Sequence, residues 1–147
     1  MWVGIVAVLI AGVMVGVEFS VAVFVNPIFD RLPADGGIAA RSDGAKVLGR
    51  VMPFWYIGSL LLVIWWVIAA WSDPRTWAAI VAGVLLVVTV IMSVLLLVPI
   101  NDRVRTWSAG PVPDDWKQQM SRWDRMHQLR VAILVVAFTL LIFALAG

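Results

Sequence analysis

The sequence contains no cysteine and only one histidine among its 147 residues. The absence of cysteine excludes disulfides, thiolate catalysis and iron–sulfur clusters. A single histidine without cysteine cannot build a closed structural zinc site within one chain. Charge is scarce too, because charged residues make up 14% of the chain and the net charge is only +2. We therefore expect no nucleic-acid partner, and the absence of a P-loop or Gly-rich nucleotide motif argues against nucleotide-driven chemistry.

Apolar residues dominate instead, at 63% of the chain, with a mean hydropathy of +0.98. A helix needs about 20 apolar residues to cross a bilayer. Four segments meet this length, at residues 2–29, 51–71, 77–100 and 126–146. The first lacks the basic start and cleavage site of a signal peptide, so we expect it to remain as a span. The sequence predicts one all-α domain over residues 1–147, a four-helix transmembrane bundle.

The connections between these segments differ in length and charge. Residues 72–75 form a tight turn, whereas residues 30–50 and 101–125 form two long connections. Ten of the eleven basic residues lie in or beside the long connections, and only Arg75 lies on the opposite side. By the positive-inside rule, both long connections are cytoplasmic and both termini lie outside the cell membrane.

The start of the fourth span carries a regular pattern. Asp114 and Asp115 suit the first turn of a helix, which we expect to run from the cytoplasmic interface to the C-terminus. At 100° per residue, four large side chains then share one face within about 60°. They are Trp116, Trp123, His127 and Arg130. The tryptophans also fit an interfacial belt, and Arg130 also fits a side chain that extends to the headgroups.

Glu18 is the one ionisable residue of the first span. It lies roughly 15 Å from the expected cytoplasmic boundary, where a carboxylate marks either an ion pair or a working site. Arg50 or Arg130 could pair with it, and Asn26 follows two turns later on nearly the same face. Polar residues at membrane depth all fall in this half, which predicts a pocket open to the cytosol. The other candidates for that pocket are Trp55, Tyr56 and Asn101.

Small residues recur every fourth position in the first span, at Gly12, Gly16 and Ser20, and a similar notch is formed by Ala79 and Gly83. Such positions let helices approach closely. We expect them to tighten the bundle, with a homo-oligomer as the alternative. The other expected partners are membrane lipids and a small hydrophobic ligand. We find no internal repeat in the sequence, and the outer half lacks polar groups, so transport by alternating access is not favoured.

The sequence resembles the anthrone oxygenase-like family of small four-span membrane proteins over essentially the whole chain. The motifs that carry the resemblance are Asn26-Pro27, Leu32-Pro33, Val98-Pro99-Ile100-Asn101 and the Trp116, Trp123, His127, Arg130 series. The resemblance implies a four-helix membrane protein. In characterised relatives it also implies the oxidation of an anthrone to an anthraquinone by dioxygen, with no obligatory metal or cofactor.

The residues present suit that chemistry. His127 would be the base, because the ordinary pKa of histidine is about 6.5. Arg130 and Asn101 would stabilise the enolate oxygen, and Glu18 would balance the cationic groups. The residues expected to contact the substrate are Arg50, Trp55, Tyr56, Trp116, Trp123 and Asn26.

Two other functions fit the same residues. The first is a haem-binding membrane protein, with His127 as an axial ligand and Arg50 or Arg130 paired with a propionate. The second is a small accessory subunit, or a carrier of a hydrophobic molecule, without enzymatic activity.

Overall fold

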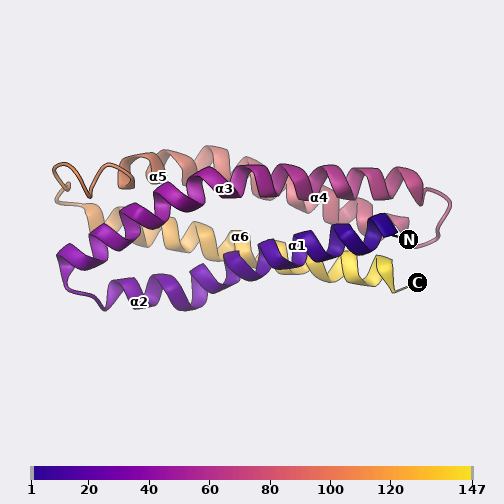
Figure 1. The fold of residues 1–147 in the computed structure, drawn as a ribbon, viewed down its shortest axis with the longest axis horizontal. Coiled ribbons are helices and arrows are strands. Elements are labelled where there is room, and N and C mark those ends of the chain that lie inside the picture. Colours follow the sequence, from indigo (N-terminus) through magenta and orange to yellow (C-terminus); the bar gives the residue numbers. More distant parts are fainter. Residues whose placement is uncertain (1, 147) are drawn as a thin grey trace.

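Four long helical rods make up the computed structural model, which describes residues 2–146 (Figure 1). The first rod joins α1 (Trp2–Ser20), η1 (Val21–Val25) and α2 (Asn26–Asp30), and the second is α3 (Ala34–Ala69). The third joins α4 (Thr76–Met92), η2 (Ser93–Leu97) and α5 (Val98–Val104), and the fourth is α6 (Trp116–Leu145). No strand occurs among the described residues, so the all-α four-helix prediction is confirmed.

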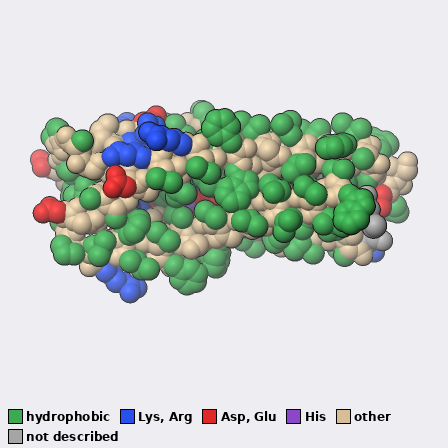
Figure 2. Space-filling model, viewed as in Figure 1, with side chains coloured by type: hydrophobic (Ala, Val, Ile, Leu, Met, Phe, Trp, Pro, Cys, Tyr) green, Lys and Arg blue, Asp and Glu red, His purple; other side chains and the backbone are tan. Residues whose placement is uncertain are grey.

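Each rod is long and apolar enough to cross a membrane. Both termini and the turn between α3 and α4 lie at one end of the bundle, which we call the terminal end (Figure 1). Residues 31–33 and 105–115 connect the rods at the other end, which we call the basic end because Lys and Arg gather there (Figure 2). Hydrophobic side chains cover most of the remaining length, as a lipid-facing surface requires (Figure 2).

The rods form a closed ring in which α1 packs on α3, α3 on α4, α4 on α6 and α6 on α1. The main core contains Met14, Leu86 and Leu134, each at most 2% exposed. Gly12 brings α1 close to α6, because a Cβ atom there would lie only 2.7 Å from Cζ of Phe138. This glycine therefore tightens the bundle within one chain, whereas a homo-oligomer stays a prediction.

The second rod is longer than the sequence predicts. We expected residues 30–50 to form a connection because they are rich in glycine, but α3 begins at Ala34 and runs without a break through Pro53. Contacts across the basic end hold this extension in place. One of them is the Ser42 hydroxyl, which donates to the backbone oxygen of Arg105 at 3.1 Å. Tertiary contacts thus override a low local helix propensity here.

Two five-residue π-helical turns, η1 and η2, interrupt the first and third rods. Each precedes a proline, Pro27 or Pro99, in the first turn of the short helix that follows. Proline has no N–H and its ring crowds the carbonyl four residues earlier. A π turn widens the helix where proline disturbs the backbone hydrogen bonds, and such turns are frequent at functional sites.

The two π turns precede similar short segments of sequence. Asn26-Pro27-Ile28-Phe29-Asp30-Arg31 follows η1, and Val98-Pro99-Ile100-Asn101-Asp102-Arg103 follows η2. The first and third rods thus share a π turn followed by a similar six-residue segment. We overlooked this short similarity when we expected no internal repeat.

Candidate functional site

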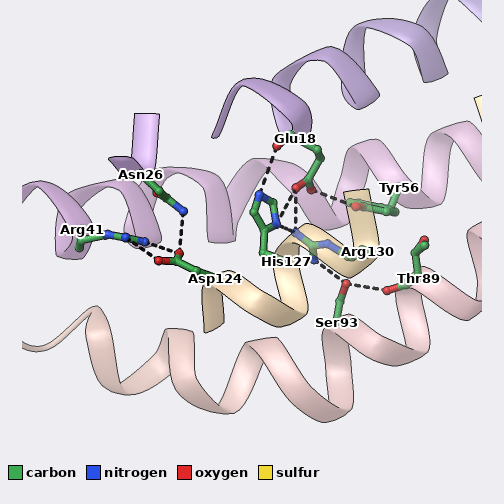
Figure 3. Close-up of polar contacts among 9 residues, drawn as sticks. All are labelled: Glu18, Asn26, Arg41, Tyr56, Thr89, Ser93, Asp124, His127 and Arg130. Carbon is green, nitrogen blue, oxygen red and sulfur yellow. Dashed lines mark hydrogen bonds and ion pairs between the residues drawn. The ribbon is translucent and has the colours of Figure 1, made fainter. Parts of the chain in front are cut away.

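A buried polar cluster surrounds Glu18, which is 3% exposed on α1 (Figure 3). Its Oε1 accepts a hydrogen bond from the Tyr56 hydroxyl at 2.9 Å. Its Oε2 accepts one from Nη2 of Arg130 at 2.8 Å, so Arg130 is the cation that pairs with this carboxylate. Three of the four rods thus meet at one carboxyl group.

His127 lies one turn before Arg130 on α6 and is 1% exposed. Its Nε2 lies 3.2 Å from the backbone oxygen of Glu18, and its Nδ1 lies 3.0 Å from Nη2 of Arg130. These contacts fit a neutral ring that donates through Nε2–H and accepts at Nδ1. Nδ1 also lies 3.3 Å from Oε2 of Glu18. The indole of Trp123 stacks on the imidazole, with ring centroids 4.6 Å apart.

The fourth rod is tied to the third through Ser93, the first residue of η2. Nη1 of Arg130 donates to the Ser93 hydroxyl at 2.7 Å, and that hydroxyl donates to the backbone oxygen of Thr89 at 2.7 Å (Figure 3). Sequence reasoning missed Ser93, because an isolated serine in an apolar span usually bonds only to its own helix. The signal in the sequence was a polar serine in the third span, the span that directly precedes the one carrying Arg130.

One hydrogen-bond donor of Arg130, its Nε–H, is unpaired. The residue is 8% exposed. Leaving a buried polar group unpaired costs about 1–3 kcal/mol, and more for a charged group. This nitrogen is enclosed by the protein, so the cost falls within the packed cluster.

An apolar cavity of about 380 Å³ adjoins this cluster. Its volume falls within the range of small-molecule sites, which is about 300–1,000 Å³. Most of its wall is aliphatic, from all four rods. The predicted residues that line it are Glu18, Tyr56, Asn101, Trp123, His127 and Arg130. The site thus combines an apolar chamber with one charged and hydrogen-bonded end.

Four other predicted residues do not line this cavity, namely Arg50, Trp55, Trp116 and Asn26. Arg50 is exposed and borders a shallow surface depression at the basic end, so it does not pair with Glu18. Trp55 points to the first rod, where its Nε1 donates to the backbone oxygen of Ile10 at 3.1 Å. Trp116 packs beside the buried Met120 in the small core of the basic end. Arg50, Trp55 and Trp116 thus do not line the cavity in which we expected them to contact a substrate.

Asn26 belongs to a second polar network at the basic end (Figure 3). Its Nδ2 donates to Oδ1 of Asp124 at 3.0 Å. Arg41 donates to the same carboxylate at 2.7 and 2.9 Å and to Asp30 at 2.8 Å. Asn26 lines a separate cavity of about 120 Å³, which shares Asn101 and Trp123 with the larger one. This network joins α2, α3 and α6, and sequence reasoning missed Arg41 because it placed that residue in a connection.

We expect Arg41→Gln to lower the free energy of unfolding by about 2 kcal/mol, because two carboxylates lose their charged donor. The midpoint of thermal unfolding in detergent measures this change. Lys46→Gln is the matched control, since Lys46 donates to the exposed Asp43 at 3.2 Å and to the Ser108 hydroxyl at 2.7 Å, and a surface ion pair contributes at most about 1 kcal/mol. Equal shifts for both variants would contradict a bracing role for Arg41.

The geometry also bears on metal and haem binding. Residues 2–146 contain no group of three or more side chains of the kinds His, Cys, Asp and Glu that could hold a metal ion. Both ring nitrogens of His127 are engaged inside the protein. An axial haem ligand needs one nitrogen free to face the iron. The haem interpretation would therefore require the cluster to be dismantled.

Comparisons with known proteins identify the family of the chain. No curated protein and no solved structure gives a significant match to the chain. The sequence profile described as anthrone oxygenase matches residues 45–140, which is more than half of the chain and includes Tyr56, Ser93, His127 and Arg130. The chain therefore belongs to the anthrone oxygenase family.

Proposed function

We propose that this protein oxidises a flat, hydrophobic polycycle of the anthrone or phenol type with dioxygen, in the cavity beside Glu18. The observation that carries the proposal is the buried cluster of Glu18, Arg130 and His127 at one end of an apolar cavity. Family membership supports the reaction class. The fold alone would not, because one fold supports many functions.

The reaction needs little from the protein beyond acid–base chemistry and charge stabilisation. The CH₂ carbon of an anthrone lies between two aryl rings, and loss of its proton gives an electron-rich enolate. The enolate reduces dioxygen, and a hydroperoxide forms at that carbon. Loss of water from the hydroperoxide leaves a carbonyl group. One oxygen atom of O₂ enters the quinone and the other enters water, so no external reductant is consumed.

Arg130 is placed to hold the enolate oxygen. Its side chain lines the cavity, and a donor that is fixed before the reaction stabilises developing charge without reorganisation. Nη2 also donates to Nδ1 of His127, and this bond can shift to the substrate oxygen. The shift would leave the Nδ1 lone pair available to accept a proton.

His127 and Glu18 together fit the role of the base. A protonated His127 would find an acceptor for each N–H, namely the backbone oxygen of Glu18 for Nε2 and Oε2 of the same residue for Nδ1. The product of proton transfer is thus stabilised by groups already in place, and positioned bases contribute about 10²–10⁴-fold to rate. Glu18 then has a second function besides balancing Arg130.

Tyr56 and Trp123 provide aromatic surface in the cavity, and the remaining walls are mainly aliphatic. One amide N–H of Asn101 donates a hydrogen bond to the backbone oxygen of Ala45, at 3.4 Å. Its second N–H is then free to donate to a substrate oxygen. We further propose that the basic end faces the cytoplasm of a cell-membrane protein, because ten of the eleven basic residues lie toward it.

Purified protein in liposomes tests the function directly. With anthrone as substrate, we expect anthraquinone absorbance to rise in step with oxygen uptake, at one O₂ per quinone. Empty liposomes give the background rate of autoxidation. A protein that binds the polycycle but does not exceed this background would support the carrier interpretation and contradict the oxygenase.

A further inference from the structure

The cavity opens through the side of the bundle. Seven residues of its wall are also exposed, and Gly49, Asp102 and Arg105 among them lie toward the basic end. The other four lie toward the middle of the bundle, Pro53 and Ile57 on α3 and Val94 and Val98 on the third rod. Ile57, Val94 and Val98 are 53%, 58% and 43% exposed. We call the gap between these four residues the lateral opening. Its rim carries no charged side chain.

The lateral opening lies at the depth of the lipid chains. Pro53 and Ile57 fall within the expected span 51–71, and Val94 and Val98 fall within 77–100. Val94 is four residues, or about 6 Å, beyond Val90, the midpoint of the third rod. The hydrocarbon core extends about 15 Å to either side of the bilayer centre. Molecules dissolved in the bilayer can therefore reach the opening without crossing the headgroups.

Local structure explains why the rods separate here. Toward the terminal end, α3 and α4 are close, and a Cβ atom on Gly83 would lie 3.5 Å from Cγ1 of Val63. Farther along, the π turn η2 widens the third rod, starting at Ser93. On the basic-end side of the opening the two rods are close again, because a Cβ atom on Gly49 would lie 3.1 Å from Nδ2 of Asn101. Between these two close approaches, α3 presents only the short ring of Pro53. The gap follows from these features together.

The same cavity also reaches the basic end, where Asp102 and Arg105 line it. These two exposed side chains form an ion pair of 3.1 Å. An apolar molecule gains nothing by passing a charged and hydrated pair. It does gain by remaining in lipid, since each buried CH₂ group favours an apolar environment by about 0.8 kcal/mol.

We propose that the ligand enters and leaves the cavity laterally, from the bilayer, through the lateral opening. The occupant is a flat apolar polycycle with an acceptor oxygen, because the opening is apolar and the charged donor Arg130 lines the chamber. The proposal rests on the proposed function only in that the cavity must bind such a polycycle. It replaces our expectation of a pocket that opens to the cytosol.

The experiment follows the binding of acridone, a fluorescent tricyclic ketone in which N–H replaces the reactive carbon of anthrone. Stopped-flow energy transfer from tryptophan to acridone, in liposomes, gives the association rate. We expect Val94→Trp, which fills the opening, to slow association about tenfold. Leu95→Trp is the matched control, because Leu95 is 67% exposed on the same turn but does not line the cavity. Arg105→Trp obstructs the basic end, and we expect both controls to remain within about twofold of the unmodified chain.

Two further variants show whether slower association could result from misfolding of the Val94→Trp protein. Ile57→Trp narrows the opening from α3 and should slow association as Val94→Trp does, while Val94→Ala widens it and should speed association. Slowing by Arg105→Trp but not by the two opening variants would overturn the proposal, as would equal slowing by all of them. Absence of acridone binding to the unmodified chain would instead reject the ligand site itself, and with it the proposed function.

Discussion

His127→Ala is expected to lower the turnover number for anthrone oxidation by about 10²–10⁴-fold, the usual contribution of a positioned base. The imidazole is the group whose protonated form already has an acceptor for each N–H, at 3.2 and 3.3 Å on Glu18. Oxygen uptake at saturating anthrone measures the change. Acridone should still bind, because the aliphatic walls of the cavity and Arg130 remain.

Gln128→Ala provides the matched control, since Gln128 is the next residue on α6 and is exposed. We expect its turnover to equal that of the unmodified chain. If His127→Ala retained normal turnover while acridone bound normally, the base would have to be another group, with Glu18 as the first candidate. Loss of acridone binding together with turnover would instead indicate that His127 shapes the cavity.

Glu18→Gln is expected to destabilise the protein by about 3–5 kcal/mol, the cost of breaking a buried ion pair. The guanidinium of Arg130 would keep its charge at membrane depth and lose its anionic partner at 2.8 Å. The Tyr56 hydroxyl would lose a charged acceptor at 2.9 Å as well. The free energy of unfolding in mixed micelles measures the loss.

A double-mutant cycle separates the ion pair from general packing. Arg130→Gln alone leaves Glu18 unpaired, whereas the double variant removes both charges. The double variant should therefore be more stable than the sum of the two single changes predicts, with a coupling of about 0.5–3 kcal/mol. Arg130→Lys, which keeps a charge near Glu18, should lose less than Arg130→Gln. Strict additivity would mean that the two side chains do not stabilise each other.

The sequence predicts the four rods well because lipid imposes a simple rule. A segment in hydrocarbon must satisfy its own backbone hydrogen bonds, so length and hydropathy are enough to find it. The same rule does not reach the basic end, where α3 begins at Ala34 rather than near Val51. That extension depends on Arg41, whose two carboxylate partners come from α2 and α6. Contacts between distant segments leave little trace in local composition.

The site was only partly predictable, for a related reason. The face of α6 that carries Trp123, His127 and Arg130 stands out, because polar side chains at regular spacing define it. Between residues 51 and 69 almost every side chain of α3 is apolar, so composition does not fix which way this part of the helix is turned. Packing between helices decides that orientation in a membrane. Trp55 and Tyr56 are neighbours in sequence, yet only Tyr56 lines the cavity.

The similarity between the first and third rods has a consequence for how the site meets its ligand. Glu18 lies three residues before η1, and Val90 lies three residues before η2. The two rods offer equivalent positions to the cavity, one a carboxylate and the other an aliphatic side chain. The cavity is therefore polar on the side of Glu18 and aliphatic on the side of Val90. A planar molecule between them can present its oxygen edge to the first and the remainder of its rings to the second, and has one orientation in which both are satisfied.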